Sequence, residues 1–188
     1  MTSPGPQWRD EEVVVVDYDP AWPDLFAAEA VLLDAAIGEW ITGGIHHVGS
    51  TAVPGLGAKP VIDILVGVGS LEASRPCIDL VAPLRYRYAP YRTEQMHWFC
   101  KPDPAHRTHH LHLVPTGSQR YADELAFRDY LRAEDDRARA YEVLKRELAS
   151  QFRDDREAYT EGKGSFVTDT LALARRVGRC QEDSICDC

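Results

Sequence analysis

Apolar residues recur with two different periods along this chain, and the change of period separates a strand-rich first part from a helical second part. Residues 12–16 form a β-branched run that is typical of a strand. Asp19 and Pro20 then supply an N-cap and a first helical residue, and Gly38 supplies a stop, for one amphipathic helix. The apolar residues of that helix lie at helical spacing and are expected to cover a sheet: Trp22, Phe26, Leu33 and Ile37.

The middle of the chain reads as strands joined by loops. Residues 45–66 predict a strand, a Gly-Ser turn, a loop rich in glycine and proline, and a second strand. The pattern then predicts a helix followed by three strands, over residues 70–84, 85–92, 97–101 and 108–115. From residue 119 onward the pattern is helical, with helices over 135–152 and 156–177, and two glycines around residue 163 break the last one.

The composition is that of an ordinary globular protein. We expect one domain over residues 11–178 of the 188, with a flexible leader at 1–10 and a flexible acidic, cysteine-containing tail at 179–188. The five cysteines show no disulfide framework. No apolar run reaches the length of a membrane span and the N-terminus lacks the layout of a signal peptide, so we expect a cytoplasmic protein. The formal net charge of -9 argues against nucleic acid as a partner, because phosphate backbones require a basic surface.

Gly49, Ser50 and Thr51 form a turn after the first central strand, and Asp63 lies within the second, V-I-D-I-L-V. A glycine in such a turn lets backbone N–H groups approach an anion, and two hydroxyls add donors, so phosphate is the expected guest. A carboxylate among apolar neighbours requires a cation or metal as its partner. The alternative is structural in both cases, since glycines make ordinary turns and a strand aspartate can face solvent or cap a loop.

His110 and His112 alternate with leucines in a strand-like run, so both imidazoles face one side. With Asp63 they would form a mixed carboxylate and imidazole set, which suits Mn²⁺, Zn²⁺ or Fe²⁺ better than Mg²⁺. Two other interpretations stay open. The two histidines lie on the solvated side of the sheet, or they hydrogen-bond a substrate.

Several cationic side chains of the helical part are candidates for contact with phosphate. Arg128 and Arg132 share a helix face one turn apart, where a guanidinium fork suits phosphate oxygens, and the alternative is a solvated helix face. Lys163 lies between two glycines, so a helix break there would aim it toward a phosphate. Lys145 lies beside an apolar helix face, and we expect its ammonium to reach water, with a position in the cleft as the alternative.

The run from His47 to Asp63, H-V-G-S-T-A-V-P-G-L-G-A-K-P-V-I-D, resembles the signature of the GrpB family, which is placed in the DNA polymerase beta-like nucleotidyltransferase superfamily. Shorter runs resemble the same family, and the whole match extends over residues 13–173: V-D-Y-D-P-A-W, H-L-H-L-V, F-R-D-Y-L-R and Y-E-V-L-K. The superfamily pattern sets a Gly-Ser turn ahead of a strand whose two acidic residues, separated by one, hold Mg²⁺ on a nucleoside triphosphate. Gly49, Ser50 and Asp63 match it, whereas Leu65 stands at the second acidic position.

The resemblance implies an α/β (α+β) fold, with a nucleotidyltransferase-like mixed, mostly antiparallel sheet of about five strands, flanking helices and a helical C-terminal portion. It implies an enzyme that uses a nucleoside triphosphate and a divalent metal, Mg²⁺ or Mn²⁺ before Zn²⁺, to transfer a nucleotidyl group to a small-molecule acceptor or to activate that acceptor. Two alternatives remain. One is a catalytically inactive nucleotide- or protein-binding module, which Leu65 favours, and the other is a metal-dependent hydrolase.

The site residues that follow from these arguments fall into three groups. Those expected to bind the nucleotide are Gly49, Ser50, Thr51, Arg128, Arg132 and Lys163. Those expected to act in catalysis are Asp63, Lys59, His110 and His112. Those expected to bind the metal, which is also the set for the hydrolase, are Asp63, His110 and His112.

Overall fold

The structure, a computed structural model, describes residues 11–185, with side chains described as far as residue 177. The predicted leader at 1–10 and residues 186–188 of the predicted tail lie outside the described residues. Within the described part of the chain, no helix is both long enough and apolar enough to cross a membrane.

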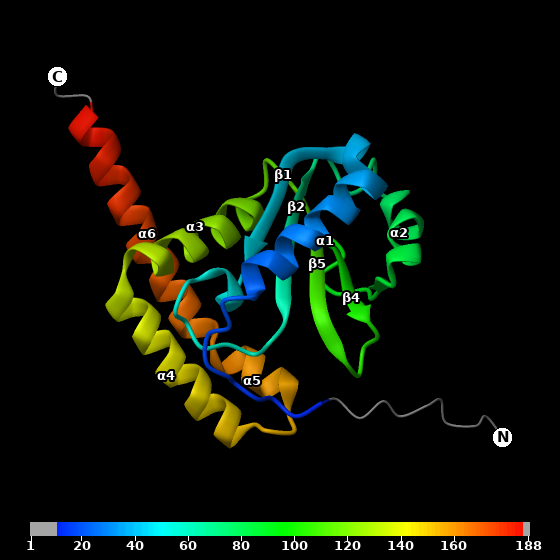
Figure 1. Ribbon diagram of the computed structural model, residues 1–188. Coiled ribbons are helices and arrows are strands. Elements are labelled where there is room, and N and C mark those ends of the chain that lie inside the picture. Colours follow the sequence, from blue (N-terminus) through cyan, green and yellow to red (C-terminus); the bar gives the residue numbers. More distant parts are fainter. Residues whose placement is uncertain (1–10, 186–188) are drawn as a thin grey trace.

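Five strands form one sheet at the centre of the fold (Figure 1). Their order across the sheet is β1, β2, β5, β4 and β3, with bounds Ile41–Val48, Ile62–Val68, Arg107–Pro115, His97–Pro102 and Arg87–Tyr88. Strands β2 and β5 run parallel, and the other neighbouring pairs among these strands are antiparallel. A mixed, mostly antiparallel sheet with flanking helices confirms the predicted fold class.

The side chains of strand β2 point alternately to the two faces of the sheet. Its alternate residues belong to the larger apolar cluster, together with Leu33 and Ile37 of helix α1 (Trp22–Ile37): Ile62, Ile64, Val66 and Val68. Burial of each such side chain stabilises the fold by about 1.5–3 kcal/mol, so α1 is fixed across this face (Figure 1). Because successive side chains of a strand alternate, Asp63 and Leu65 face the opposite side.

Four helices follow the sheet along the chain and gather beside it in Figure 1, with the far end of α6 projecting outward. They are α3, α4, α5 and α6, over Gln119–Ala133, Asp135–Gln151, Arg156–Gly162 and Gly164–Ile185. The predicted break around residue 163 is confirmed, because α5 ends and α6 begins there. Helix α6 continues beyond the predicted end at residue 177, because Gly178 weakens a helix by about 1 kcal/mol without ending it.

The expected strand over residues 12–16 is not part of the sheet. Val16 forms an isolated β-bridge with Ala58, and the N–H of Val13 donates to the carbonyl of Arg153 at 2.8 Å. The side chain of Val13 packs with Leu148 and its neighbours near the end of α4. The β-branched run is therefore an extended segment that packs on the C-terminal helices, and the prediction of a sheet strand is wrong.

Three other predicted elements are shorter than the pattern indicated. Helix α1 begins two residues after Pro20, because the carboxylate of Asp19 accepts a hydrogen bond from the N–H of Ala21 at 2.9 Å and forms a turn first. Residues 70–84 contain two short helical pieces, α2 at Cys77–Leu80 and a 3₁₀ turn at Ala82–Leu84. Strand β3 has two residues, because Pro90 has no N–H to donate to a neighbouring strand.

Candidate functional site

Asp63 lies near the start of β2, in register with Val48 of β1 and His110 of β5. It lines a cavity of about 760 Å³ whose wall also includes Gly49, residues of α3, and Tyr141 of α4. Cavities that bind small molecules usually enclose about 300–1,000 Å³. The strand register therefore brings the predicted carboxylate to a space of suitable size, beside the predicted Gly-Ser turn.

Gly49 is required by the close approach of the Asp63 carboxylate. Its φ is 71° and its ψ is -171°, a combination that residues with a side chain rarely adopt. A Cβ atom at this position would overlap Oδ2 of Asp63 and lie 3.0 Å from its Cγ. The glycine that we predicted to admit a phosphate therefore admits this carboxylate, and it lines the same cavity.

Asp63 and His110 form a hydrogen-bonded pair, with 2.8 Å between Oδ1 and Nδ1. An ionised carboxylate only accepts hydrogen bonds, so Nδ1 carries the proton and donates. Burial acts to raise the pKa of Asp63, but this hydrogen bond and the positive potential of His110, His112 and Lys163 hold that pKa below its usual value. Burial also lowers the pKa of His110, against the opposing effect of Asp63. At pH 7 the pair is therefore a carboxylate and a neutral imidazole.

His112 shares this face of the sheet but pairs with a different acid. Its Nδ1 lies 3.1 Å from Oε2 of Glu124 on α3, and Nη2 of Arg120 lies 2.9 Å from Oε1 of the same carboxylate. Burial acts to lower the pKa of His112, but the charge and hydrogen bond of Glu124 raise it above the usual value. The His112 side chain thus fixes β5 to α3.

The predicted metal set is assembled only in part. Asp63 and His110 are joined, yet among the residues that the structure describes no three His, Cys, Asp or Glu side chains are grouped to hold a metal ion. Leu65, at the second acidic position, is fully buried in an apolar cluster with Val48 and Met96. As arranged, these side chains do not fit a metal held by protein ligands alone. Metal binding, and with it the hydrolase built on Asp63, His110 and His112, stays a prediction.

Lys163 stands at the break between α5 and α6, on the side of Asp63. Its Nζ lies 4.3 Å from the centre of the Tyr159 ring. Burial lowers the pKa of Lys163 to about 8, and the attraction of the Asp63 carboxylate limits the decrease. Lys163 therefore interacts electrostatically with Asp63 without lining the Asp63 cavity, and its direction toward a phosphate stays a prediction.

Lys145 is buried, with 2% of its surface exposed, so the prediction that it reaches water is wrong. Its Nζ donates a hydrogen bond to the carbonyl of Gly57 and lies 4.8 Å from the centre of the Tyr141 ring. Burial, with added repulsion from Lys163, lowers its pKa to about 7. The cause is the loop before β2, which packs on α4 and supplies the carbonyl.

Ser50, Thr51 and Lys59 have different surroundings. Ser50 lies beside Tyr141, which lines the Asp63 cavity, and its hydroxyl acts to lower the pKa of that phenol against the effect of burial. The buried hydroxyl of Thr51 donates to a backbone carbonyl at 3.2 Å, so it accepts from the Nε2–H of His47 at 3.0 Å and is already engaged. Lys59 is half-buried in the loop before β2 and lines neither of the two cavities described here. The roles proposed for these three stay predictions.

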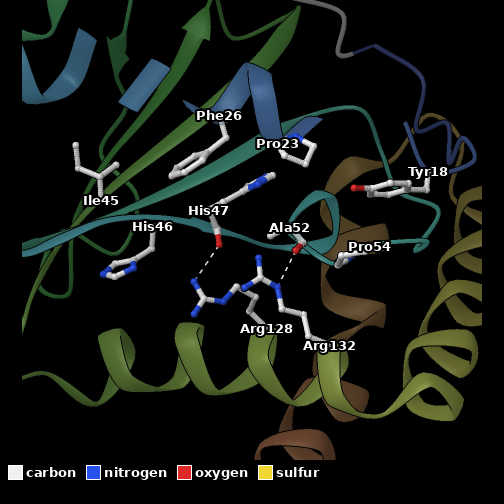
Figure 2. A pocket seen from close by; sticks show the side chains of 10 residues that line it. All are labelled: Tyr18, Pro23, Phe26, Ile45, His46, His47, Ala52, Pro54, Arg128 and Arg132. Carbon is white, nitrogen blue, oxygen red and sulfur yellow. Dashed lines mark hydrogen bonds between the residues drawn. The ribbon is translucent and has the colours of Figure 1, made fainter. Parts of the chain in front are cut away.

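Arg128 and Arg132 line a second cavity, of about 340 Å³, rather than the Asp63 cavity (Figure 2). Nη1 of Arg128 donates to the carbonyl of His47 at 3.2 Å, and Nε of Arg132 donates to the carbonyl of Ala52 at 2.9 Å. The two side chains share one face of α3, as the spacing indicated (Figure 2). Their contact with triphosphate oxygens stays a prediction.

Glu124 and Tyr141 line the Asp63 cavity although no sequence pattern singled them out as site residues. Glu124 stands four residues from both Arg120 and Arg128, and the ion pair forms with Arg120. Helical spacing alone does not choose between the two arginines. The choice depends on which face of α3 meets His112, and that is a tertiary contact.

Comparison with known proteins identifies relatives of the whole domain. Residues 12–173 match the family described as GrpB protein. A UPF0157 protein of Pseudomonas aeruginosa is 43% identical, over 93% of this chain and 76% of that protein. The Glutamate-rich protein GrpB of Alkalihalophilus pseudofirmus is 35% identical, over 85% of this chain and 94% of that protein. The crystal structure of the conserved protein GrpB from Enterococcus faecalis matches with a TM-score of 0.79 and 33% identity, over 86% of this chain and 96% of that one. The chain therefore belongs to the GrpB family.

Proposed function

We propose that this GrpB family chain binds a nucleoside triphosphate in the Asp63 cavity and transfers its nucleotidyl group to a small-molecule acceptor, or uses it to activate that acceptor. The observation that carries the proposal is an ionised carboxylate held at the wall of a cavity of about 760 Å³, against the Gly49 turn. Partly buried carboxylates that stay ionised through specific partners are frequent in functional sites.

The charges of the cavity wall favour a nucleotide that arrives with its cation. Acidic residues of the wall outnumber basic ones: Asp63, Glu94, Asp123 and Glu124 stand against Arg92 and Arg120. A free triphosphate would be repelled, whereas its complex with a divalent cation presents a positive centre to carboxylates. Such a cation supplies charge neutralisation when bound, and the roles of the residues below do not depend on it.

Lys163 is suited to hold a phosphate oxygen. Its pKa of about 8 leaves it charged at pH 7, and its partly desolvated ammonium lies near Asp63. Electrostatic interactions strengthen where water is excluded, so a fixed ammonium stabilises charge that develops during transfer. Because the helix break at residue 163 fixes the direction of this side chain, the ammonium needs little reorganisation on binding.

His110 adjoins the cavity through its hydrogen bond to Asp63, without lining it, and is suited to accept a proton from an acceptor hydroxyl. Its Nδ1–H is held by Asp63, so the lone pair lies on Nε2, and that buried atom has no hydrogen-bond partner among the described residues. A buried polar atom without a partner is costly, by about 1–3 kcal/mol, and a bound substrate hydroxyl would remove the cost. The lowered pKa of His110 keeps the ring neutral at pH 7, as a general base requires.

A binding module without turnover is the second candidate, and Leu65 favours it. A fully buried leucine replaces the acid that the superfamily pattern uses as a second metal ligand. On this alternative the protein binds the nucleotide in the same cavity and releases it unchanged.

Turnover distinguishes the two candidates. Purified protein is incubated with each common nucleoside triphosphate, Mg²⁺ or Mn²⁺ and a panel of hydroxyl and carboxylate acceptors, and pyrophosphate release is measured. The proposal predicts release by the native chain and its loss in Asp63→Ala, with Asp79→Asn on the exposed side of α2 as the control. Binding without release in every combination would replace the enzyme by the binding module.

A further inference from the structure

The second cavity combines two guanidinium groups with an apolar wall. It lies at the edge strand β1, between α1 and α3, and Figure 2 shows Arg128 and Arg132 rising side by side from α3 toward it. Phe26 and Pro23 of α1 form the opposite wall (Figure 2). Its volume of about 340 Å³ is enough for a small ligand, since such pockets begin at about 300 Å³.

Positive charge in this cavity is not fully neutralised. No aspartate or glutamate is among the residues that line it. Asp129 lies outside the wall and serves both arginines, at 2.7 Å from Nε of Arg128 and at 3.9 Å from Nη1 of Arg132. Burial and the nearby charge of Arg128 lower the pKa of Arg132, because two neighbouring cations repel each other. One carboxylate, more than half exposed, therefore faces two guanidinium groups.

The guanidinium groups are fixed before any ligand arrives. Nη1 of Arg128 and Nε of Arg132 each donate to a carbonyl of the β1 end and its turn, at 3.2 and 2.9 Å. Within the described part of the chain, Nη2 of each group has no hydrogen-bond acceptor, so donors remain for a ligand. A planar fork with free donors binds carboxylate and phosphate oxygens in pairs.

The side of the cavity toward α1 is apolar in character. The ring of His47 stacks on that of Phe26, with 4.9 Å between centroids and 8° between planes. Its Nε2–H is bonded to Thr51, and burial lowers its pKa to about 4, so it is a neutral ring at pH 7. A flat apolar group packs well against stacked rings of this kind.

We propose that this second cavity binds a small organic anion, a carboxylate or a phosphate monoester with a flat apolar body. The anionic group pairs with the forks of Arg128 and Arg132, and the apolar body lies toward Phe26 and His47. The inference does not depend on the proposed function, because the residues that carry it line the cavity at β1 and not the one at Asp63.

The test uses four probes with the full chain: phenyl phosphate, benzoate, inorganic phosphate and the neutral benzyl alcohol. Isothermal titration calorimetry should show saturable binding of phenyl phosphate and benzoate. Inorganic phosphate, which lacks the apolar body, and benzyl alcohol, which lacks the anionic group, should each bind at least about tenfold more weakly. Arg132→Gln should weaken phenyl phosphate at least about tenfold. The control Arg139→Gln removes the same charge from a side chain that is 69% exposed on α4, and should leave binding unchanged.

Two further variants test the proposal if Arg132→Gln perturbs the fold. Phe26→Leu should weaken phenyl phosphate and leave the weak binding of inorganic phosphate unaltered. Asp63→Asn should leave phenyl phosphate binding unchanged, and a clear change of affinity in that variant, in either direction, would place the anion in the Asp63 cavity and overturn the proposal. So would the absence of saturable binding by the native chain, or equal affinities for phenyl phosphate and inorganic phosphate.

Discussion

Replacement of Gly49 by alanine tests the geometry on which the site depends. The backbone at Gly49 has a φ of 71° and a ψ of -171°, a region in which a residue with a side chain is strained by about 1–3 kcal/mol. The new Cβ would also overlap Oδ2 of Asp63, with its Cγ at 3.0 Å and its Cβ at 3.1 Å. The carboxylate must move, and the hydrogen bond to His110, a bond to a charged group worth about 1.5–3 kcal/mol, is weakened or lost.

Two other glycines separate these effects. Gly55 has a φ of 77° but open space around its Cα, so Gly55→Ala should cost only the backbone strain, about 1–2 kcal/mol. Gly117 has neither a positive φ nor a near neighbour, so Gly117→Ala should range from no change to a gain of about 1 kcal/mol. The sum for Gly49→Ala is about 2.5–6 kcal/mol, a large share of a typical unfolding free energy of about 5–15 kcal/mol.

Urea unfolding of the three variants gives the free energies, and an NMR titration of His110 reports on the carboxylate. Displacement of Asp63 should lower the pKa of His110 further, because Asp63 is the group that opposes the effect of burial. In an Asp63→Ala background, Gly49→Ala should cost less, because Oδ2 and Cγ are gone. If Gly49→Ala were no more destabilising than Gly55→Ala and left the His110 titration unchanged, the close packing of glycine and carboxylate would be refuted.

Three further predictions concern buried groups around the site. Lys145→Met should stabilise the fold at pH 7, as measured by urea unfolding. As pH rises from 7 toward 10, the difference in unfolding free energy between the variant and the native chain should shrink by up to about 1.4 kcal/mol per pH unit. The reason is that the unfolded native chain still holds the Lys145 proton that the folded chain has released. A constant advantage would contradict the lowered pKa. Glu124→Gln should lower the pKa of His112 in an NMR titration, because burial is then opposed only by the weaker attraction of Asp63. The native pair should lose its stabilising effect as pH rises through the raised pKa of His112. Leu65→Asp should destabilise the fold by about 3–5 kcal/mol in urea unfolding by placing a charge in an apolar cluster, and an unchanged midpoint would show that the position tolerates an acid.

Elements with a strong local period were predictable from sequence. The strand at residues 108–115 agrees with β5 to within one residue, and the helix at 135–152 agrees with α4 in the same way. Asp63 could be singled out because an acid is unusual in an apolar strand, and His110 because histidines alternate with leucines along its strand. The mixed, mostly antiparallel character of the sheet was not readable from periodicity and was expected only from the resemblance to a family.

Contacts between distant segments were not predictable. Lys101 on β4 donates to the buried Glu29 of α1, with 2.7 Å between Nζ and Oε2 across 72 positions of sequence. The sequence pattern around Lys145 is the same as that around an exposed helical lysine. Lys145 is buried because the loop before β2 packs on α4. The separation of Arg132 from the Asp63 cavity likewise depends on how α3 lies on the sheet, which no pattern within α3 specifies.

Calorimetric titration shows whether a nucleoside triphosphate binds in the cavity at Asp63. Each common nucleoside triphosphate with Mg²⁺ is titrated into the native chain, Asp63→Asn and the control Asp79→Asn. We expect saturable binding of at least one nucleotide by the native chain and the control, and at least about tenfold weaker binding by Asp63→Asn, because the variant lacks a charged partner for the bound complex. Equal affinity in Asp63→Asn, or no binding of any nucleotide to the native chain, would contradict this expectation.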